Sequence, residues 1–180
     1  FGINTVNPAP TATVTLADST LTTGETTAVN IVFSEIVTGL TVDDLTVGNG
    51  TVTDLASSDE GLSWTGTFTP TAGVQASNSV IEVNLAGVKD GGDKAGVGSA
   101  SSAVYVVDTK APTAVITMSD TALNAGDTSE VTITFDEYPV GFTADDLTVS
   151  NGTLGTLTQF NEGPVWTGTF TPNAGTTDFT

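Results

Sequence analysis

The sequence predicts an all-β fold of tandem antiparallel β-sandwich domains, the second of which is incomplete. Two observations support this prediction. First, residues 64–70, Trp-Thr-Gly-Thr-Phe-Thr-Pro, return unchanged as residues 166–172, a shift of 166 − 64 = 102 residues. Second, short stretches with apolar residues at alternate positions recur between turn-forming residues, and no stretch has the period of an amphipathic helix.

The same shift aligns the rest of the repeat without a gap, for example Phe33 with Phe135. A period of 102 residues is too long for a solenoid unit and suits an independent domain. We therefore expect three segments. Residues 1–9 would be the end strand of a preceding module plus a linker, residues 10–109 a complete module, and residues 110–180 a truncated second module that lacks its last two strands.

Seven short strands are expected in the complete module, because alternating apolar residues are typical of half-buried strands. They are residues 14–16, 29–33, 45–47, 51–55, 62–68, 80–85 and 103–107. The Asn49-Gly50 pair is typical of a type I′ turn, so it predicts a hairpin between the third and fourth strands. Trp64 and Trp166 continue inward-facing series and are expected in the core. This pattern indicates immunoglobulin-like sandwiches, without the disulfide of antibody domains because the chain has no cysteine.

The second module repeats the pattern through Pro172 and lacks counterparts of residues 80–85 and 103–107. A sandwich without two strands exposes apolar edges and half of its core. Truncation is the explanation we favour. The alternative is that another copy of the chain supplies a strand, with residues 1–7 as a possible donor for the last of the two missing strands.

The composition excludes several classes of function. The chain has 21 acidic and 3 basic residues and a formal net charge of −18, so we expect neither nucleic acid nor an anionic membrane surface as a partner. It contains no stretch suited to direct membrane insertion. Without cysteine or histidine it has no thiolate nucleophile and lacks the commonest general base. No carboxylate pair stands out as a glycosidase site, so we expect no enzyme and no catalytic residues.

The acidic loops predict calcium sites, because calcium prefers carboxylate, amide and carbonyl oxygens. In an immunoglobulin topology the loop after the second strand and the last hairpin loop lie at the same end of the domain as its N-terminus. This arrangement would gather Glu35, Asp90 and Asp93 near the incoming linker. Clustered carboxylates repel one another unless a cation neutralises them. The alternative is that they are solvated loop residues that keep the chain soluble.

The same geometry predicts a second group of calcium ligands at the junction of the two modules. Asp108 lies at the linker, and it would approach Asp136 and Glu137 in the first loop of the second module. Magnesium is a less suitable ion here because it prefers an octahedral shell rich in water.

Several motifs occur in a characteristic order along the chain. They are residues 33–35 (Phe-Ser-Glu), 44–47 (Asp-Leu-Thr-Val), 49–51 (Asn-Gly-Thr), 64–70, 88–90 (Val-Lys-Asp) and 107–112 (Val-Asp-Thr-Lys-Ala-Pro). In this the chain resembles the bacterial immunoglobulin-like extender repeats of giant secreted repeats-in-toxin adhesins. The resemblance implies export to the bacterial cell surface, neighbouring modules of the same chain as partners, and calcium bound within and between modules. The chain departs from the family in one loop, which in the family usually ends in Gly-Asn. Here residues 90–94 read Asp-Gly-Gly-Asp-Lys, so a lysine lies beside the candidate ligands.

The function expected from these observations is that of a structural spacer, stiffened by calcium, that projects a distal binding domain. Two alternatives remain open. The chain would itself bind a carbohydrate, ice or another cell if Thr rows or aromatic side chains faced solvent on one sheet. It would polymerise with other copies of itself as a surface filament if the exposed strands were exchanged.

Overall fold

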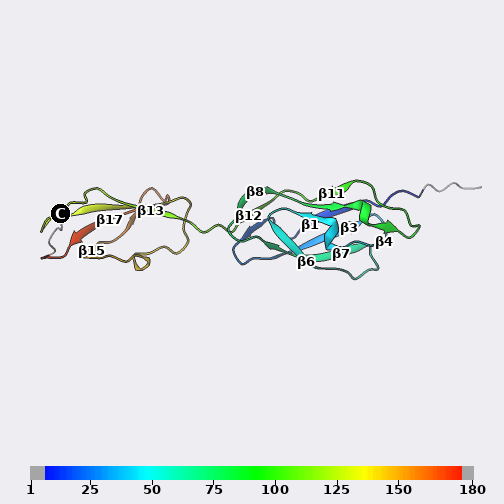
Figure 1. The fold of residues 1–180 in the computed structure, drawn as a ribbon, viewed down its shortest axis with the longest axis horizontal. Coiled ribbons are helices and arrows are strands. Elements are labelled where there is room, and N and C mark those ends of the chain that lie inside the picture. The colour runs from blue at the N-terminus through cyan, green and yellow to red at the C-terminus, as the bar shows by residue number, and fades with distance from the viewer. Residues whose placement is uncertain (1–6, 176–180) are drawn as a thin grey trace, which may run out of the picture. The chain divides into compact units, whose positions relative to one another are not determined.

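The computed structural model describes residues 7–175, and the chain divides into two compact units, Phe1–Lys110 (unit 1) and Ala111–Thr180 (unit 2) (Figure 1). Strands dominate both units, so the all-β prediction is confirmed. The helical elements of the described residues are single 3₁₀ turns, η1 (Val42–Asp44), η2 (Leu85–Gly87) and η3 (Ala144–Asp146). No helix in this part of the chain is long and apolar enough to cross a membrane. The strand expected within residues 1–7 falls almost entirely outside the described residues.

One layer of unit 1 is a four-stranded antiparallel sheet in the order β1-β3-β7-β6. Its strands are β1 (Ala12–Leu16), β3 (Thr27–Phe33), β6 (Gly50–Ser57) and β7 (Ser63–Pro70). In β3 the side chains of Val29, Ile31 and Phe33 are buried, and those between them are more exposed. This is the alternation that a strand shows when one face of its sheet is covered.

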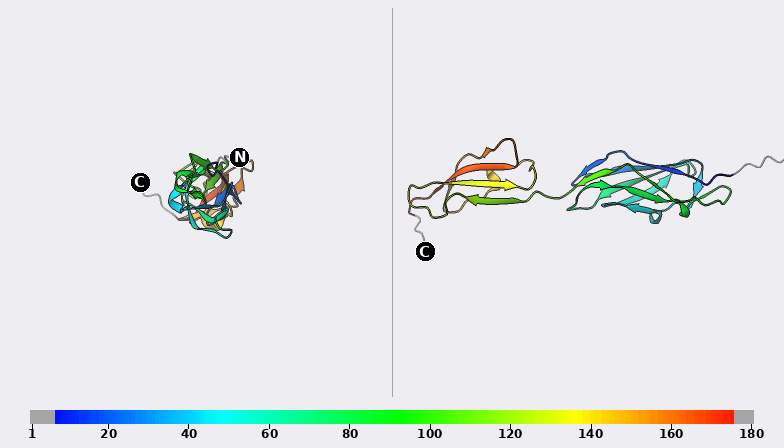
Figure 2. Two further views of the ribbon diagram at one scale, coloured as in Figure 1. Left: turned by 90° about the vertical axis from the view of Figure 1, so that its right-hand side faces the viewer. Right: turned by 90° about the horizontal axis from the view of Figure 1, so that it is seen from above.

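The other layer of unit 1 consists of shorter strands (Figure 2). One group has the order β11-β9-β5 and the other the order β2-β12-β8, in which β12 runs parallel to β2. The strands are β2 (Thr20–Thr22), β5 (Leu45–Val47), β8 (Gln75–Ser79), β9 (Ile81–Asn84), β11 (Ser99–Ser101) and β12 (Tyr105–Asp108). Two further short strands, β4 (Val37–Thr38) and β10 (Lys89–Asp90), form an antiparallel pair of their own.

The core of unit 1 lies between these layers. Val14, Val29 and Ile31 from the four-stranded sheet and Ile81, Val83, Tyr105 and Val107 from the opposite layer belong to one buried cluster. The rings of Phe68 and Tyr105 meet edge to face with their centroids 5.1 Å apart. Trp64 packs against the same cluster, as expected from its place in the alternating series.

The Asn49-Gly50 pair does not form the expected hairpin. Strand β5 pairs with β9 and strand β6 pairs with β7, so the chain crosses from one layer to the other at this turn. Only Asn49 has a positive φ, 53°, whereas a type I′ turn needs positive φ at both central residues. Gly50 is required for a different reason: a Cβ there would lie 2.3 Å from the ring of Phe68. The prediction was wrong because local turn preference does not reveal which sheet receives the next strand.

The described part of unit 2 forms a sheet in the order β13-β14-β17-β15, with β16 also paired to β17. Its strands are β13 (Ala114–Met118), β14 (Ser129–Phe135), β15 (Gly152–Leu154), β16 (Thr158–Gln159) and β17 (Val165–Pro172). Ile133 pairs with Trp166 as Ile31 pairs with Trp64, so the register repeats with the sequence. Within residues 111–175 no strand corresponds to β5, β8, β9, β11 or β12.

The core of unit 2 is small and aromatic. Val131, Ile133 and Trp166 are its buried hydrophobic residues. Trp166 meets the rings of Phe135 and Phe142 edge to face, with centroids 5.5 and 5.3 Å from its own. Trp166 therefore fills the core, as predicted.

Candidate functional site

The first candidate site lies at the end of unit 1 where the chain enters. Strands β4 and β10 pair antiparallel, with Val37 opposite Asp90, so the two loops predicted to share one end of the module do so. Asn7 reaches the same place, and its Nδ2 donates a hydrogen bond to Oδ2 of Asp90 across 2.7 Å. The incoming segment is thus attached to the last hairpin loop.

Donors of the protein itself surround the Asp90 carboxylate. Its Oδ1 accepts the backbone N–H groups of Gly92 and Lys94, each at 2.8 Å. The bond from the Lys94 backbone contributes most to lowering the pKa of Asp90 below 3.8, with burial opposing it and Asn7 and Gly92 adding to it. The Lys94 ammonium in turn donates to the backbone carbonyl oxygen of Asn7. The residue is only 5% exposed, so this network replaces the water that an ionised carboxylate needs.

The other predicted ligands at this end have different surroundings. Asp93, at φ 63°, accepts a hydrogen bond from the Lys89 ammonium at 2.9 Å, which raises the pKa of Lys89. Both side chains are exposed, so this ion pair contributes little to stability. Glu35 is half-buried in the loop after β3.

At this end of unit 1 Asp90 already accepts three N–H groups, and Asp93 has a lysine partner. More generally, residues 7–175 contain no group of three or more Asp, Glu, His or Cys side chains placed to hold a metal. The assignment of Glu35, Asp90 and Asp93 as calcium ligands stays a prediction.

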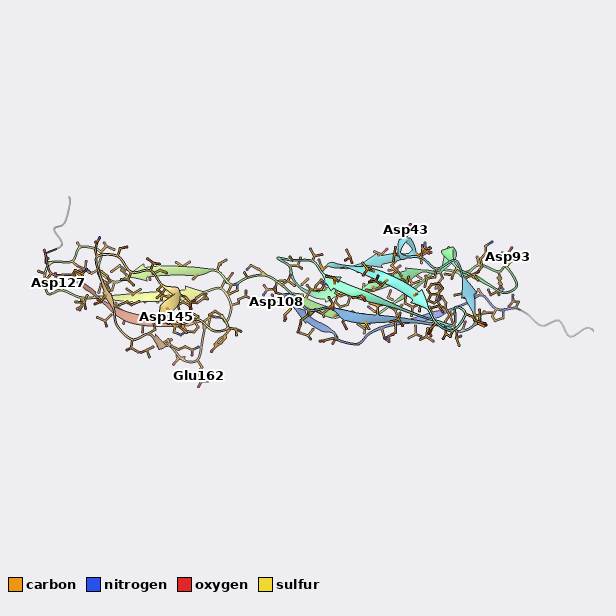
Figure 3. The ribbon with its side chains drawn as sticks, turned by 90° about the horizontal axis from the view of Figure 1, so that it is seen from below. Asp43, Asp93, Asp108, Asp127, Asp145 and Glu162 are labelled. Atoms are coloured by element: carbon orange, nitrogen blue, oxygen red, sulfur yellow. The ribbon has the colours of Figure 1, made fainter. Side chains whose placement is uncertain are left out.

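Asp108 lies at the opposite end of unit 1 from Asp93 (Figure 3). One of its carboxylate oxygens, Oδ2, accepts a hydrogen bond from Nε2 of Gln75 at 3.3 Å. The other, Oδ1, is buried and has no hydrogen-bond partner among residues 7–175. A buried acceptor without a donor costs free energy, and a cation is a chemically suitable partner for it. The assignment of Asp108 as a calcium ligand stays a prediction.

The remaining two predicted ligands belong to unit 2. Asp136 is exposed, and its Oδ1 accepts the backbone N–H of Thr113 at 2.7 Å. Glu137 is half-buried. Their proximity to Asp108 stays a prediction.

Sequence reasoning missed the residue that holds the end of β12 in place. Thr109 is 8% exposed, and its Oγ1 donates to the carbonyl oxygen of Thr71 at 2.6 Å and accepts the N–H of Val74 at 3.0 Å. Its backbone N–H donates to the carbonyl oxygen of Val74 at 2.7 Å. Threonine is abundant in the chain, so nothing in the sequence distinguishes this one.

Comparison with known families agrees with this architecture. A family model described as bacterial Ig-like domain matches residues 6–107 and again residues 108–180. The chain belongs to the bacterial Ig-like domain family. The two matches to the Ig-like model meet close to the division between unit 1 and unit 2.

Other comparisons add little to this family assignment. Curated protein sequences yield no significant match to this Ig-like chain. Among solved structures it is similar to the Escherichia coli adhesin FdeC, with 17% sequence identity and a TM-score of 0.39. The alignment covers 91% of this chain and 55% of that one, so the chain spans about half the length of the solved adhesin. A TM-score this low does not identify a shared function.

Proposed function

We propose that this tandem bacterial Ig-like chain is a non-catalytic spacer, an extender segment of a bacterial cell-surface adhesin that holds a binding domain away from the cell. The observation that carries the proposal is the attachment of unit 1 to the chain at both of its ends. Asn7 is bonded to Asp90 where the chain enters, and Thr109 is bonded to Thr71 and Val74 where it leaves. In unit 1 the entering and leaving segments are thus both bonded to the module, which supports a spacer that limits local freedom of the chain at its ends.

Calcium is the second part of the proposal. We propose that calcium binds at Asp108, and that Asp136 and Glu137 are the further ligands to test. The support is the buried Oδ1 atom of Asp108, which lacks a hydrogen-bond donor, together with the net charge of −18. A cation bound there would neutralise local repulsion and reduce the freedom of the chain that follows β12.

Thermal unfolding tests the calcium proposal. We expect the Tm to be higher in excess calcium than with a chelator, at constant ionic strength, because a ligand that binds only the folded state stabilises it by mass action. Asp108→Asn should reduce this difference, whereas Asp43→Asn, a change to an exposed 3₁₀-turn residue, should preserve it. An equal Tm with and without calcium would exclude calcium from the mechanism.

Distances between two spin labels test the stiffness itself. The chain has no cysteine, so Ser58→Cys in unit 1 and Thr156→Cys in unit 2 provide unique exposed labelling sites. A spacer predicts a narrow distribution of distances in calcium, and the calcium proposal predicts broadening after chelation. Ser58→Cys with Asp43→Cys, both in unit 1, is the control that should stay narrow throughout. A broad distribution in calcium would contradict the spacer proposal.

A further inference from the structure

The sheet of unit 2 has an outer face, which is the side turned away from the core. Residues that lie opposite one another on paired strands point to the same side of a sheet. Ile133 and Trp166 lie opposite each other and belong to the core, so the residues next to them in the chain point outward. The corresponding face of unit 1 is open to solvent although that module has both layers, since Val32 on it is 48% exposed. The exposure of the outer face therefore does not depend on a second layer.

A row of four threonines crosses the outer face of unit 2. In spatial order, β13, β14, β17 and β16 contribute Thr117, Thr132, Thr167 and Thr158. Neighbouring strands lie about 4.8 Å apart, so the row is roughly 14 Å long. The outer two threonines are exposed and the inner two half-buried. Within residues 7–175 none of the four hydroxyls bonds to another protein group, so each can donate to and accept from a ligand.

Unit 1 does not repeat this row. The corresponding positions hold Thr15, Asn30, Thr65 and Ala56. Oγ1 of Thr65 donates to Oδ1 of Asn30 at 3.3 Å, so these two polar groups satisfy each other within the sheet. The row of unbonded hydroxyls is thus a feature of unit 2 and not of the repeat.

An exposed aromatic ring lies on the same face. Phe160 comes two positions after Thr158, and its backbone N–H donates to the carbonyl oxygen of Val165 at 2.8 Å. This bond continues the register in which Thr158 lies opposite Thr167, so the ring of Phe160 points to the side of Thr158. Phe160 is 61% exposed, and the equivalent residue of unit 1 is Ser58. The ring, like the row, belongs to unit 2 alone.

A tight turn fixes the backbone of Phe160. Asn161 and Glu162 follow it with φ values of 51° and 53°, and the N–H of Gly163 donates to the carbonyl oxygen of Phe160 at 3.0 Å. Figure 3 shows Glu162 of this turn at the outside of unit 2. Because the backbone is already held, a ligand that packs on the ring need not order it.

We propose that the outer face of unit 2 binds a neutral glycan. One sugar packs the C–H face of its pyranose ring on Phe160, and the sugars that follow bond through their hydroxyls to the threonine row. The spacing along the row, about 4.8 Å, is comparable with the advance per sugar of an extended β1,4-linked glycan. The net charge of −18 and the carboxylate of Glu130 on the same face disfavour an acidic sugar.

The test uses the whole chain, with cellohexaose and chitohexaose as neutral probes and hexagalacturonate as an acidic probe. Calorimetry should show that at least one neutral probe binds with one molecule per chain. The NMR shifts that it causes should be confined to residues 115–117, 132–134, 158–160 and 165–167. Hexagalacturonate should bind roughly tenfold more weakly or not at all. No binding of either neutral probe at millimolar concentration, or equal binding of the acidic one, would overturn the proposal.

Two exposed aromatic residues provide a matched pair of variants. Phe160→Ser installs the residue of unit 1 and should weaken binding roughly tenfold or more, because the ring is lost from the outer face. Tyr138→Ile also installs the residue of unit 1 and should leave binding unchanged. The ring of Tyr138 lies 6.1 Å from that of Trp166, which points to the core side of the sheet. Equal weakening by both variants, with both folded by circular dichroism, would overturn the assignment to the outer face.

The threonine row is tested separately from the ring. Thr158→Val keeps the shape of the side chain, removes one hydroxyl and should weaken binding several-fold. Thr15→Val, at an exposed position of unit 1, is the control that should leave binding unchanged. Unchanged affinity of Thr158→Val would overturn the role of the row.

Ice is the competing ligand for a row of threonines. It fits less well, because strands that twist by about 20° relative to their neighbours do not present a flat array to a crystal lattice. The proposal predicts that the chain leaves a gap of zero between the freezing and melting points of its solution. A gap that Thr158→Val abolishes and Phe160→Ser preserves would assign the row to ice and overturn the choice of a glycan.

Discussion

The side-chain amide of Asn7 donates a 2.7 Å hydrogen bond to Oδ2 of Asp90, although 83 residues separate the two in the sequence. The other oxygen of the same carboxylate accepts the N–H groups of Gly92 and Lys94. One buried side chain therefore closes its own loop and also holds the segment that enters the module. These bonds favour the ionised carboxylate, which has a consequence for stability.

The contribution of Asp90 to stability should depend on pH. Its pKa in the folded protein is lowered from 3.8, chiefly by the Lys94 N–H, so its contribution is present above 3.8 and is lost as the pH falls through the lower folded-state value. Asp90→Asn keeps an oxygen acceptor and removes the charge. We expect its Tm to lie below that of the unchanged protein at neutral pH, and the gap to close in acid. A gap that stays constant down to acid pH would contradict this.

Removal of the Thr109 hydroxyl should destabilise unit 1. Thr109→Val keeps the shape of the side chain but leaves the carbonyl oxygen of Thr71 and the N–H of Val74 without their partner. We expect a loss of about 1–3 kcal/mol, measured by denaturant unfolding. Thr13→Val, in an exposed position of β1, is the control and should change stability little. Equal effects of the two substitutions would contradict the special role of Thr109.

Gly50 and Gly152, which follow Asn49 and Asn151, should not tolerate a side chain. A Cβ at Gly50 or at Gly152 would lie 2.3 Å from the ring of Phe68 or Phe170, respectively. We expect Gly50→Ala to destabilise unit 1 and Gly152→Ala to destabilise unit 2, each by about 1–3 kcal/mol, as overpacking does. Hydrogen exchange resolved by unit would separate the two effects. Gly91→Ala, where nothing lies within 4 Å of the added Cβ, is the control expected to be neutral.

Alkali should destabilise unit 1 through Tyr105. Burial raises the pKa of this phenol from 10.0 to about 12, and its hydroxyl donates to the carbonyl oxygen of Gly48. The neutral form is thus favoured by folding, and its contribution is complete below 10.0 and lost as the pH rises through about 12. Tyr105→Phe should have a lower Tm at neutral pH and a weaker decline over this alkaline range. An identical decline in both proteins would show that another group is responsible.

Much of the architecture was predictable because it depends on local pattern. The alternation of Val29, Ile31 and Phe33 predicts a half-buried strand, and the gap-free shift predicts that unit 2 repeats the register of unit 1. The meeting of the loop after β3 with the last hairpin loop also followed once the topology was inferred, and the pairing of Val37 with Asp90 confirms it.

The sequence by itself thus determined the repeat, the all-β fold and the absence of cysteine and histidine, on which many enzymes depend. Only the tertiary structure decided that Asn49-Gly50 crosses between layers, that Asp90 binds Asn7, and that one oxygen of Asp108 lacks a donor. The physical reason is one of range. Burial alternation and turn preference act between neighbours in the chain, whereas the partner of a loop side chain is chosen by groups brought together only when the sheets pack.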